Sequence, residues 1–300
     1  VLPQVAQHAS SFTHVSPALY QINYAYTGGV PQFWNSGGAD NFDGLTSAQV
    51  TQQIHAAGLK SWPLIFGGAA NAGTDQGIQN ILNDSPAGTQ AAFISSLVNE
   101  GLAKGYDGWN LDWEVDSSLT PYATYGARFG SFLGALKAAL NARGMKLSLD
   151  LGTWFIKQTW CSGGNGVADL TALSANVDQA ILEDYAATIL VGSGGCPASL
   201  QNPQTCPSPD EFTTDVNLMC VYLSPDVVSI GIDAHSTMTN PIAGQAIQAL
   251  ERYGIKNVAM WPDYNTNGPG GSYAFMDTQG IAPLGANWYD LLAGFLAHYP

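Results

Sequence analysis

The residues best suited to chemistry lie in the stretch 106–114, which reads YDGWNLDWE. In a β-strand, side chains alternate between two faces, so Asn110, Asp112 and Glu114 would share one face. Two tryptophans and a leucine would share the other. The rise of a strand separates the carboxylates of Asp112 and Glu114 by about 7 Å. Because like charges this close disfavour double ionisation, one acid should hold a proton near neutral pH. A protonated acid beside an ionised one suits the hydrolysis of a glycosidic bond.

This stretch resembles the D-G-x-D-x-D-x-E signature of glycoside hydrolase family 18, the chitinase family, at Asp107, Gly108, Asp112 and Glu114. Asn110 stands where that family usually has Asp. The last acid, whose loss usually marks an inactive relative, is present as Glu114. The resemblance implies an α/β fold, namely a (β/α)8 TIM-type barrel, and a glycoside hydrolase.

The resemblance also implies substrate-assisted retaining catalysis, to which four residues contribute. Glu114 would protonate the glycosidic oxygen while the acetamido oxygen of the sugar attacks the anomeric carbon. Asp112 would bind the acetamido N–H and stabilise the positive oxazolinium ion, and Asn110 would hold Asp112. Tyr185 would brace the acetamido oxygen. The expected partner is therefore a saccharide with 2-acetamido sugars, and we expect no cofactor and no metal ion.

Active sites of such barrels lie at the C-terminal ends of the strands. Other short segments of this chain that resemble family segments occur at these strand ends. Trp261 is in the position of the tryptophan that floors the sugar subsite. The residues expected to bind substrate at these strand ends are Tyr24, Gly67, Gly68, Trp261 and Asp263.

The strand near residue 182 fits the family less well. The family has Met-x-Tyr-Asp there, whereas this chain has Leu182-Glu183-Asp184-Tyr185. A shift of one residue turns a strand side chain to the other face. Either Tyr185 or Asp184 is therefore expected to take the substrate-contacting position.

The composition restricts the partners of the chain. Among 300 residues, 9 Lys and Arg stand against 23 Asp and Glu, which gives a formal charge of −14. Binding of nucleic acid requires a basic surface, so nucleic acid is excluded as an expected partner, and an anionic membrane is excluded for the same reason. A neutral polysaccharide remains compatible. Few lysines and many small polar residues favour a secreted protein, and we expect a processed, monomeric product.

All four cysteines lie within one 60-residue span, at Cys161, Cys196, Cys206 and Cys220. Their spacing does not match a zinc site. Two disulfides are expected, in one of three connectivities. We favour Cys196–Cys206 with Cys161–Cys220, and four buried free thiols are the alternative.

Strand-like and helix-like segments alternate along the chain, which predicts βα units around a parallel sheet. The predicted helices are 3–11, 46–58, 86–104, 122–143, 240–254 and 286–297. The predicted strands are 19–26, 60–66, 106–114, 146–153, 178–185, 227–233 and 257–262. These are seven, so the first strand of an eightfold barrel is missing or irregular. We expect one catalytic barrel domain over residues 1–300.

About 25 residues separate the last two predicted strands, which leaves no room for an inserted α+β lid domain. A shallow, open groove and endo-type cutting are therefore expected. The D-W-E form of the signature favours an endo-acting chitinase that hydrolyses β-1,4 bonds between N-acetylglucosamine units. The alternatives are an endo-β-N-acetylglucosaminidase acting on N-glycans and a non-catalytic chitin-binding lectin.

Overall fold

The computed structural model of the protein describes residues 2–23, 25–34, 38–68, 72–114, 122–152, 175–183, 223–233, 254–261 and 288–298. Its helices are α1 (Leu2–Gln7), the 3-10 turn η1 (Ala9–Ser11), α2 (Ser47–Ala56), α3 (Ala72–Asn83), α4 (Thr89–Lys104), α5 (Tyr122–Asn141) and α12 (Trp288–His298). Its strands are β1 (His14–Val15), β2 (Ala18–Gln21), β3 (Gln32–Phe33), β4 (Lys60–Ser61), β5 (Leu64–Gly68), β6 (Gly108–Glu114), β7 (Lys146–Gly152), β8 (Gln179–Glu183), β9 (Val228–Asp233) and β10 (Asn257–Trp261).

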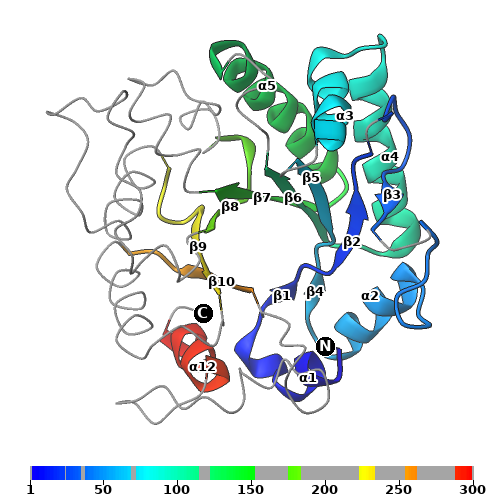
Figure 1. Cartoon of the computed structure of the whole chain (residues 1–300). Helices are drawn as coiled ribbons and strands as arrows, with labels where there is room; N and C mark the ends of the chain where they lie inside the picture. The colour runs from blue at the N-terminus through cyan, green and yellow to red at the C-terminus, as the bar shows by residue number, and fades with distance from the viewer. Residues whose placement is uncertain are drawn as a thin grey trace, which may run out of the picture.

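A parallel sheet forms the centre of the fold. Within the described residues its strands run in the order β10-β9-β8-β7-β6-β5-β2, and β3 is added antiparallel beyond β2. All neighbouring pairs from β10 to β2 are parallel. In Figure 1 these strands stand around a ring, and the helices lie outside it. The expected α/β class with a parallel sheet is confirmed.

A second, two-stranded ladder is formed by the short strands that precede β2 and β5 in the sequence. β1 pairs with β4 in parallel, and each is separated from the next strand by a two-residue step that ends in proline, 16–17 and 62–63. Proline has no N–H to give to a ladder, which interrupts the regular pairing. The Trp62 N–H donates to the Val15 carbonyl at 2.9 Å, and the Leu64 N–H donates to the Pro17 carbonyl at 2.9 Å. Each pair of short strands therefore follows the path of one interrupted strand.

Two contacts between distant parts of the sequence show how far the sheet curls. The side chain of His14 on β1 lies close enough to that of Gln179 on β8 to interact with it, although these strands are not neighbours in the sheet. Helix α12 packs against η1, so the last described helix lies next to the first residues (Figure 1). Among the described residues, β10 pairs with β9 alone, and the eighth parallel strand of a closed barrel is not seen.

Local sequence explains where several helices begin and end. The Thr46 side chain accepts from the Gln49 N–H and the Gln49 side chain accepts from the Thr46 N–H, which is a capping box at the start of α2. Gly144, at a φ of 77°, follows α5, as expected for a helix-ending glycine. Helix α3 was not predicted. Its Gly77 lowers helical propensity, but a Cβ there would collide with the backbone oxygen of Asn23.

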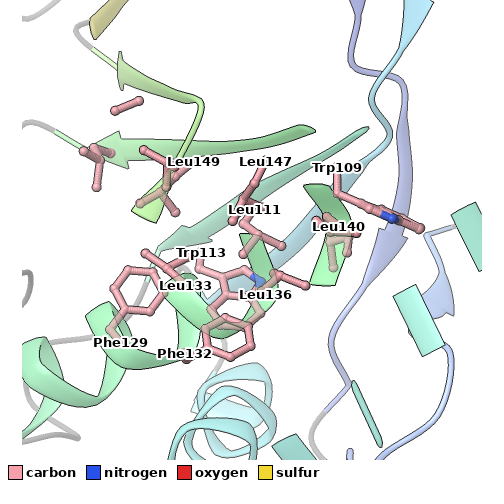
Figure 2. Packing of buried hydrophobic residues seen from close by; sticks show 14 of the residues in the cluster. Trp109, Leu111, Trp113, Phe129, Phe132, Leu133, Leu136, Leu140, Leu147 and Leu149 are labelled. Carbon is pink, nitrogen blue, oxygen red and sulfur yellow. The ribbon is translucent and has the colours of Figure 1, made fainter. Parts of the chain in front are cut away.

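The main hydrophobic core lies between the sheet and the outer helices. From β6, Trp109, Leu111 and Trp113 point into it, and all three are at most 2% exposed. Figure 2 shows Trp113 against the aromatic side chains of α5, and its ring is stacked on Phe132 with centroids 5.3 Å apart. Burial of these side chains fixes which face of β6 is turned towards the helices. The polar residues between them must then face the inside of the ring.

Candidate active site

The inner face of β6 carries buried polar residues, as the alternation in the sequence predicts. Asn110 is 1% exposed and Asp112 is 7% exposed. The sheet register places Asp112 between Phe66 on β5 and Asp150 on β7. Burial of a carboxylate is costly without polar or charged neighbours, so the groups around Asp112 decide what it can do.

Three acids from successive strands meet on this inner face. One carboxylate oxygen from each of Asp112 (β6), Asp150 (β7) and Glu183 (β8) lies within 4.8 Å of the others. Their exposed fractions are 7%, 8% and 7%. On β7 and β8 the leucines between these acids belong to the core, so the acids face inward. Like charges at this distance disfavour simultaneous ionisation, so the cluster is suited to hold a proton or a cation.

Sequence reasoning missed Asp150 and Glu183 as site residues. The signal was present in the stretch 146–152, where Asp150 alternates with leucines as Asp112 alternates with tryptophan and leucine. An acid at an inward position of a buried strand marks a candidate site residue, because burial of a carboxylate is costly without polar or charged neighbours. Glu183 immediately precedes Asp184 and Tyr185, which the Met-x-Tyr-Asp segment of the family favoured as site residues.

Asn110 is held by two partners in the structure. Its Nδ2 donates to Ser148 Oγ at 2.9 Å and to Asp150 Oδ1 at 2.8 Å. An amide nitrogen has two hydrogens, and these two bonds use both. The expectation that Asn110 holds Asp112 therefore differs from what is observed, because its amide hydrogens are directed at the neighbouring strand.

Three carboxylate oxygens this close also form the donor type that a hard divalent cation prefers. The expectation from the sequence was a site without metal. The same residues could hold Mg²⁺ or Ca²⁺ only with further oxygen ligands, because these ions take six or more. Binding of a divalent cation to this cluster must therefore be tested.

Asp107, the first acid of the signature, lies at the opposite end of β6 and has a structural role. Its carboxylate accepts from the Ser61 N–H at 2.9 Å, from Lys60 Nζ at 3.1 Å and contacts His55 Nε2 at 2.7 Å. Burial alone would raise the pKa of Asp107, but these partners outweigh burial and its pKa is lowered. Asp107 thus ties the start of β6 to β4 and α2.

An aromatic pair lies beside the acids. The Trp34 ring is stacked on Phe66, with centroids 4.8 Å apart and planes at 15°. Trp34 is 39% exposed, whereas Phe66 is opposite Asp112 in the register of β5 and β6. One face of an indole next to buried acids is a suitable surface for a sugar ring, whose C–H groups pack on aromatic faces.

The structure places some of the predicted substrate-binding residues and not others. Gly67 lies on the core side of β5, where a Cβ would come 2.9 Å from Ile78 and 3.3 Å from Trp113. Glu114 and Gly68 are opposite each other at the ends of β6 and β5, and Trp261 ends β10. The predicted site residues outside the described residues are Tyr24, Asp184, Tyr185 and Asp263.

Two further expectations also fall on residues that the structure does not describe. All four cysteines lie there, so neither disulfide pairing is tested. The same holds for residues 234–253, most of the segment between β9 and β10 that was expected to lack a lid. Within the described residues, no helix combines the length and the apolar character needed to cross a membrane.

No family model and no curated protein matches this chain by sequence. Solved structures do match it by shape. The chitinase of Chromobacterium violaceum superposes with a TM-score of 0.54 and 18% identity, over 88% of this chain and 75% of that one. Catalytic domain 2 of the group II chitinase of Ostrinia furnacalis gives a TM-score of 0.57 and 17% identity, over 76% of this chain and 58% of that one. This chain has the chitinase fold.

This fold also occurs in an enzyme that is not named as a chitinase. The spore cortex-lytic enzyme SleL of Bacillus megaterium superposes with a TM-score of 0.60 and 10% identity, over 86% of this chain and 66% of that one. A mutant of the Ostrinia domain was solved in complex with a chitooligosaccharide, (NAG)5. The family resemblance seen in the signature is thus confirmed at the level of the fold.

Proposed function

We propose that this chain is a glycoside hydrolase of the chitinase type, which cleaves β-1,4 bonds between N-acetylglucosamine units in chitin. The proposal is supported by the chitinase fold, by the signature on β6 and by the burial of Asp112. The (NAG)5 complex of the Ostrinia neighbour supports a saccharide with acetamido groups as the ligand. We infer a closed barrel, an open groove, endo-type cutting and an extracellular location for the protein.

The single observation that carries the proposal is the position of Asp112. This carboxylate is 7% exposed and lies near two further acids on the inner face of the sheet. A positive charge that develops on a substrate next to this cluster of acids would be stabilised by it. The oxazolinium ion formed by an attacking acetamido group is such a charge.

The mechanism assigns each proton and bond to a group. Glu114 donates its proton to the glycosidic oxygen as the acetamido oxygen attacks the anomeric carbon and the glycosidic bond breaks. Asp112 accepts the acetamido N–H and stabilises the oxazolinium ion, and Tyr185 braces the acetamido group. Water then opens the oxazolinium ring and gives its proton to Glu114. Residues proposed to line the subsites are Tyr24, Gly68, Asp184, Trp261 and Asp263, whereas Gly67 faces the core.

The test is release of shorter products from a chitohexaose, with Glu114→Gln and Asp112→Asn as loss-of-function variants. Both should lower kcat by roughly 10²- to 10⁴-fold, as expected for removal of a direct acid or of charge stabilisation. Asp226→Asn is a matched carboxylate-to-amide control, because its side chain is 73% exposed. It should keep the parent rate.

The alternatives give different results in the same experiment. An N-glycan enzyme would leave chitohexaose intact and release glycans from a high-mannose glycoprotein. A lectin would bind chitohexaose in calorimetry without cutting it, and its affinity would not depend on Glu114 as an acid. Internal cutting predicts products of intermediate length at early times. Release of dimers alone would contradict the endo mode.

A further inference from the structure

Asp150, like Glu183, is a buried acid for which neither the signature nor the proposed mechanism provides a role. We propose that Asp150 on β7 shares a proton with Asp112 on β6, and thereby supplies from the neighbouring strand the carboxylate that Asn110 lacks. The catalytic consequence of this inference rests on the proposed function. The sharing of the proton itself does not.

The sheet register brings the two acids together. Asp112 and Asp150 are direct partners in the ladder between β6 and β7, and both side chains face inward. A carboxylate oxygen of each lies within 4.8 Å of the other and of Glu183. Because all three are buried, full ionisation would place three negative charges in a poorly solvated space. A shared proton reduces that repulsion.

Asn110 provides an independent observation. It is 1% exposed, and its Nδ2 donates to Asp150 Oδ1 at 2.8 Å while Ser148 Oγ fixes the same nitrogen. Among the described residues its Oδ1 has no hydrogen-bond partner. A buried amide oxygen without a donor is costly. A protonated carboxyl group is a donor, so a proton on the cluster would also satisfy Asn110.

The direction of the Asn110 bond restricts where the proton can lie. Asp150 Oδ1 accepts from the amide, so the shared proton occupies Asp150 Oδ2 or an oxygen of Asp112. When substrate binds, Asp112 must be ionised to accept the acetamido N–H and to face the oxazolinium ion. The proton then rests on Asp150, and the total number of protons on the pair stays the same. Asp150 acts through Asp112 and is a positioning residue.

The test exchanges the two side chains. Asp150→Asn should lower kcat for chitohexaose by roughly tenfold to hundredfold, less than loss of a direct acid, and should move the acidic limb of the pH–rate profile. The double variant Asn110→Asp/Asp150→Asn returns a carboxylate to the signature strand. It should recover most of kcat and the original pH limb. Asp226→Asn is the control, and melting temperatures check that each variant is folded.

Two results would overturn the proposal: a folded Asp150→Asn with the parent pH–rate profile, or a folded double variant no better than the single one. A loss of activity in EDTA that Ca²⁺ or Mg²⁺ restores would also overturn it, because the cluster would then hold a cation.

A second measurement distinguishes failure of the proposed function from failure of the proton-sharing proposal. If the parent cuts no acetamido saccharide, infrared titration of the carboxyl groups still tests the proton. In the Glu114→Gln background, which removes the proton of the proposed acid, a protonated carboxyl signal should persist at neutral pH, and the further change Asp150→Asn should remove it. An unchanged signal in the variant would contradict proton sharing whatever the activity.

Discussion

Single residues on the inner face of the sheet combine burial with charge. Asp112, Asp150 and Glu183 are each under 9% exposed, and their neighbour Asn110 is held by Ser148 and Asp150. Such a group needs protons, a cation or a charged substrate to offset repulsion. The chemistry of the site therefore depends on which residue faces which, and less on how many acids the sequence contains.

Substitution of Trp34 should weaken substrate binding without lowering the stability of the fold. Trp34→Ala should raise KM for chitohexaose by about 2- to 10-fold, because an aromatic contact contributes about 0.5–1.5 kcal/mol. The melting temperature should change little, since the ring is 39% exposed. Steady-state kinetics measure the effect, and Trp34→Tyr should keep most of the affinity. An unchanged KM in Trp34→Ala would exclude this ring from the substrate surface.

At the scale of elements, the two ends of β6 have different roles. Asp107 connects its start to β4 and α2, while its inner residues carry the acids. The first acid of the signature thus positions the strand, and the later ones carry the proposed chemistry. The two roles predict different consequences of substitution.

Asp107→Asn should destabilise the fold by about 1.5–3 kcal/mol at pH 7, the contribution of hydrogen bonds to a charged group, and should leave the pH–rate profile unchanged. Because the folded-state pKa of Asp107 is lowered, its ionic contribution is present above the ordinary value of 3.8 and is lost as the pH falls below it. Urea unfolding at pH 7 and pH 3 should therefore show a smaller difference between parent and variant in acid. A constant difference would contradict the ionic role.

Helix α3 depends on close approach of its backbone to the chain before it. Gly77→Ala should destabilise the protein by about 1–3 kcal/mol, because the new methyl group collides with the Asn23 backbone oxygen and crowds Ile22. Gly294→Ala in α12 is the matched control. No atom lies within 4 Å of a Cβ there, so Ala should stabilise the helix by up to about 1 kcal/mol. Thermal unfolding compares them, and equal shifts would refute the packing argument.

At the scale of the whole molecule, contacts across the ring join segments that are far apart in sequence. The interaction between the side chains of His14 and Gln179 connects β1 with β8, and the packing of α12 on η1 brings the two ends of the described chain together. The ring of His14 is also stacked on Trp62, with centroids 4.2 Å apart. The first two of these contacts form only when the sheet has curled, so they report on the complete fold.

The stability of the protein should therefore decrease in mild acid. Burial lowers the pKa of His14 from 6.5 to about 4, and the nearby Gln179 side chain opposes this only in part. Between these values the unfolded chain binds a proton that the folded chain does not, so stability is complete above pH 6.5 and declines towards pH 4. The loss is at most about 3 kcal/mol, and less where water reaches the half-buried ring.

Urea unfolding of the parent and of His14→Phe at pH 7, 5.5 and 4 measures this loss. The variant keeps an aromatic ring against Trp62 but cannot titrate. The parent should lose more stability than the variant between pH 7 and pH 4. Parallel curves would show that His14 is not the group responsible.

The sequence alone determined the alternation on β6, the inward position of Asp112, the parallel α/β class and the ends of α2 and α5. These follow from periodicity and capping, which act over a few residues. It did not determine α3, whose Gly77 is explained by a contact with Asn23, or the interrupted strand that begins at His14. Nor did it give Asp150 and Glu183 their place beside Asp112. Only the tertiary structure decided those positions, because sheet register and curl bring together residues from separate strands, and local patterns do not encode which strands become neighbours.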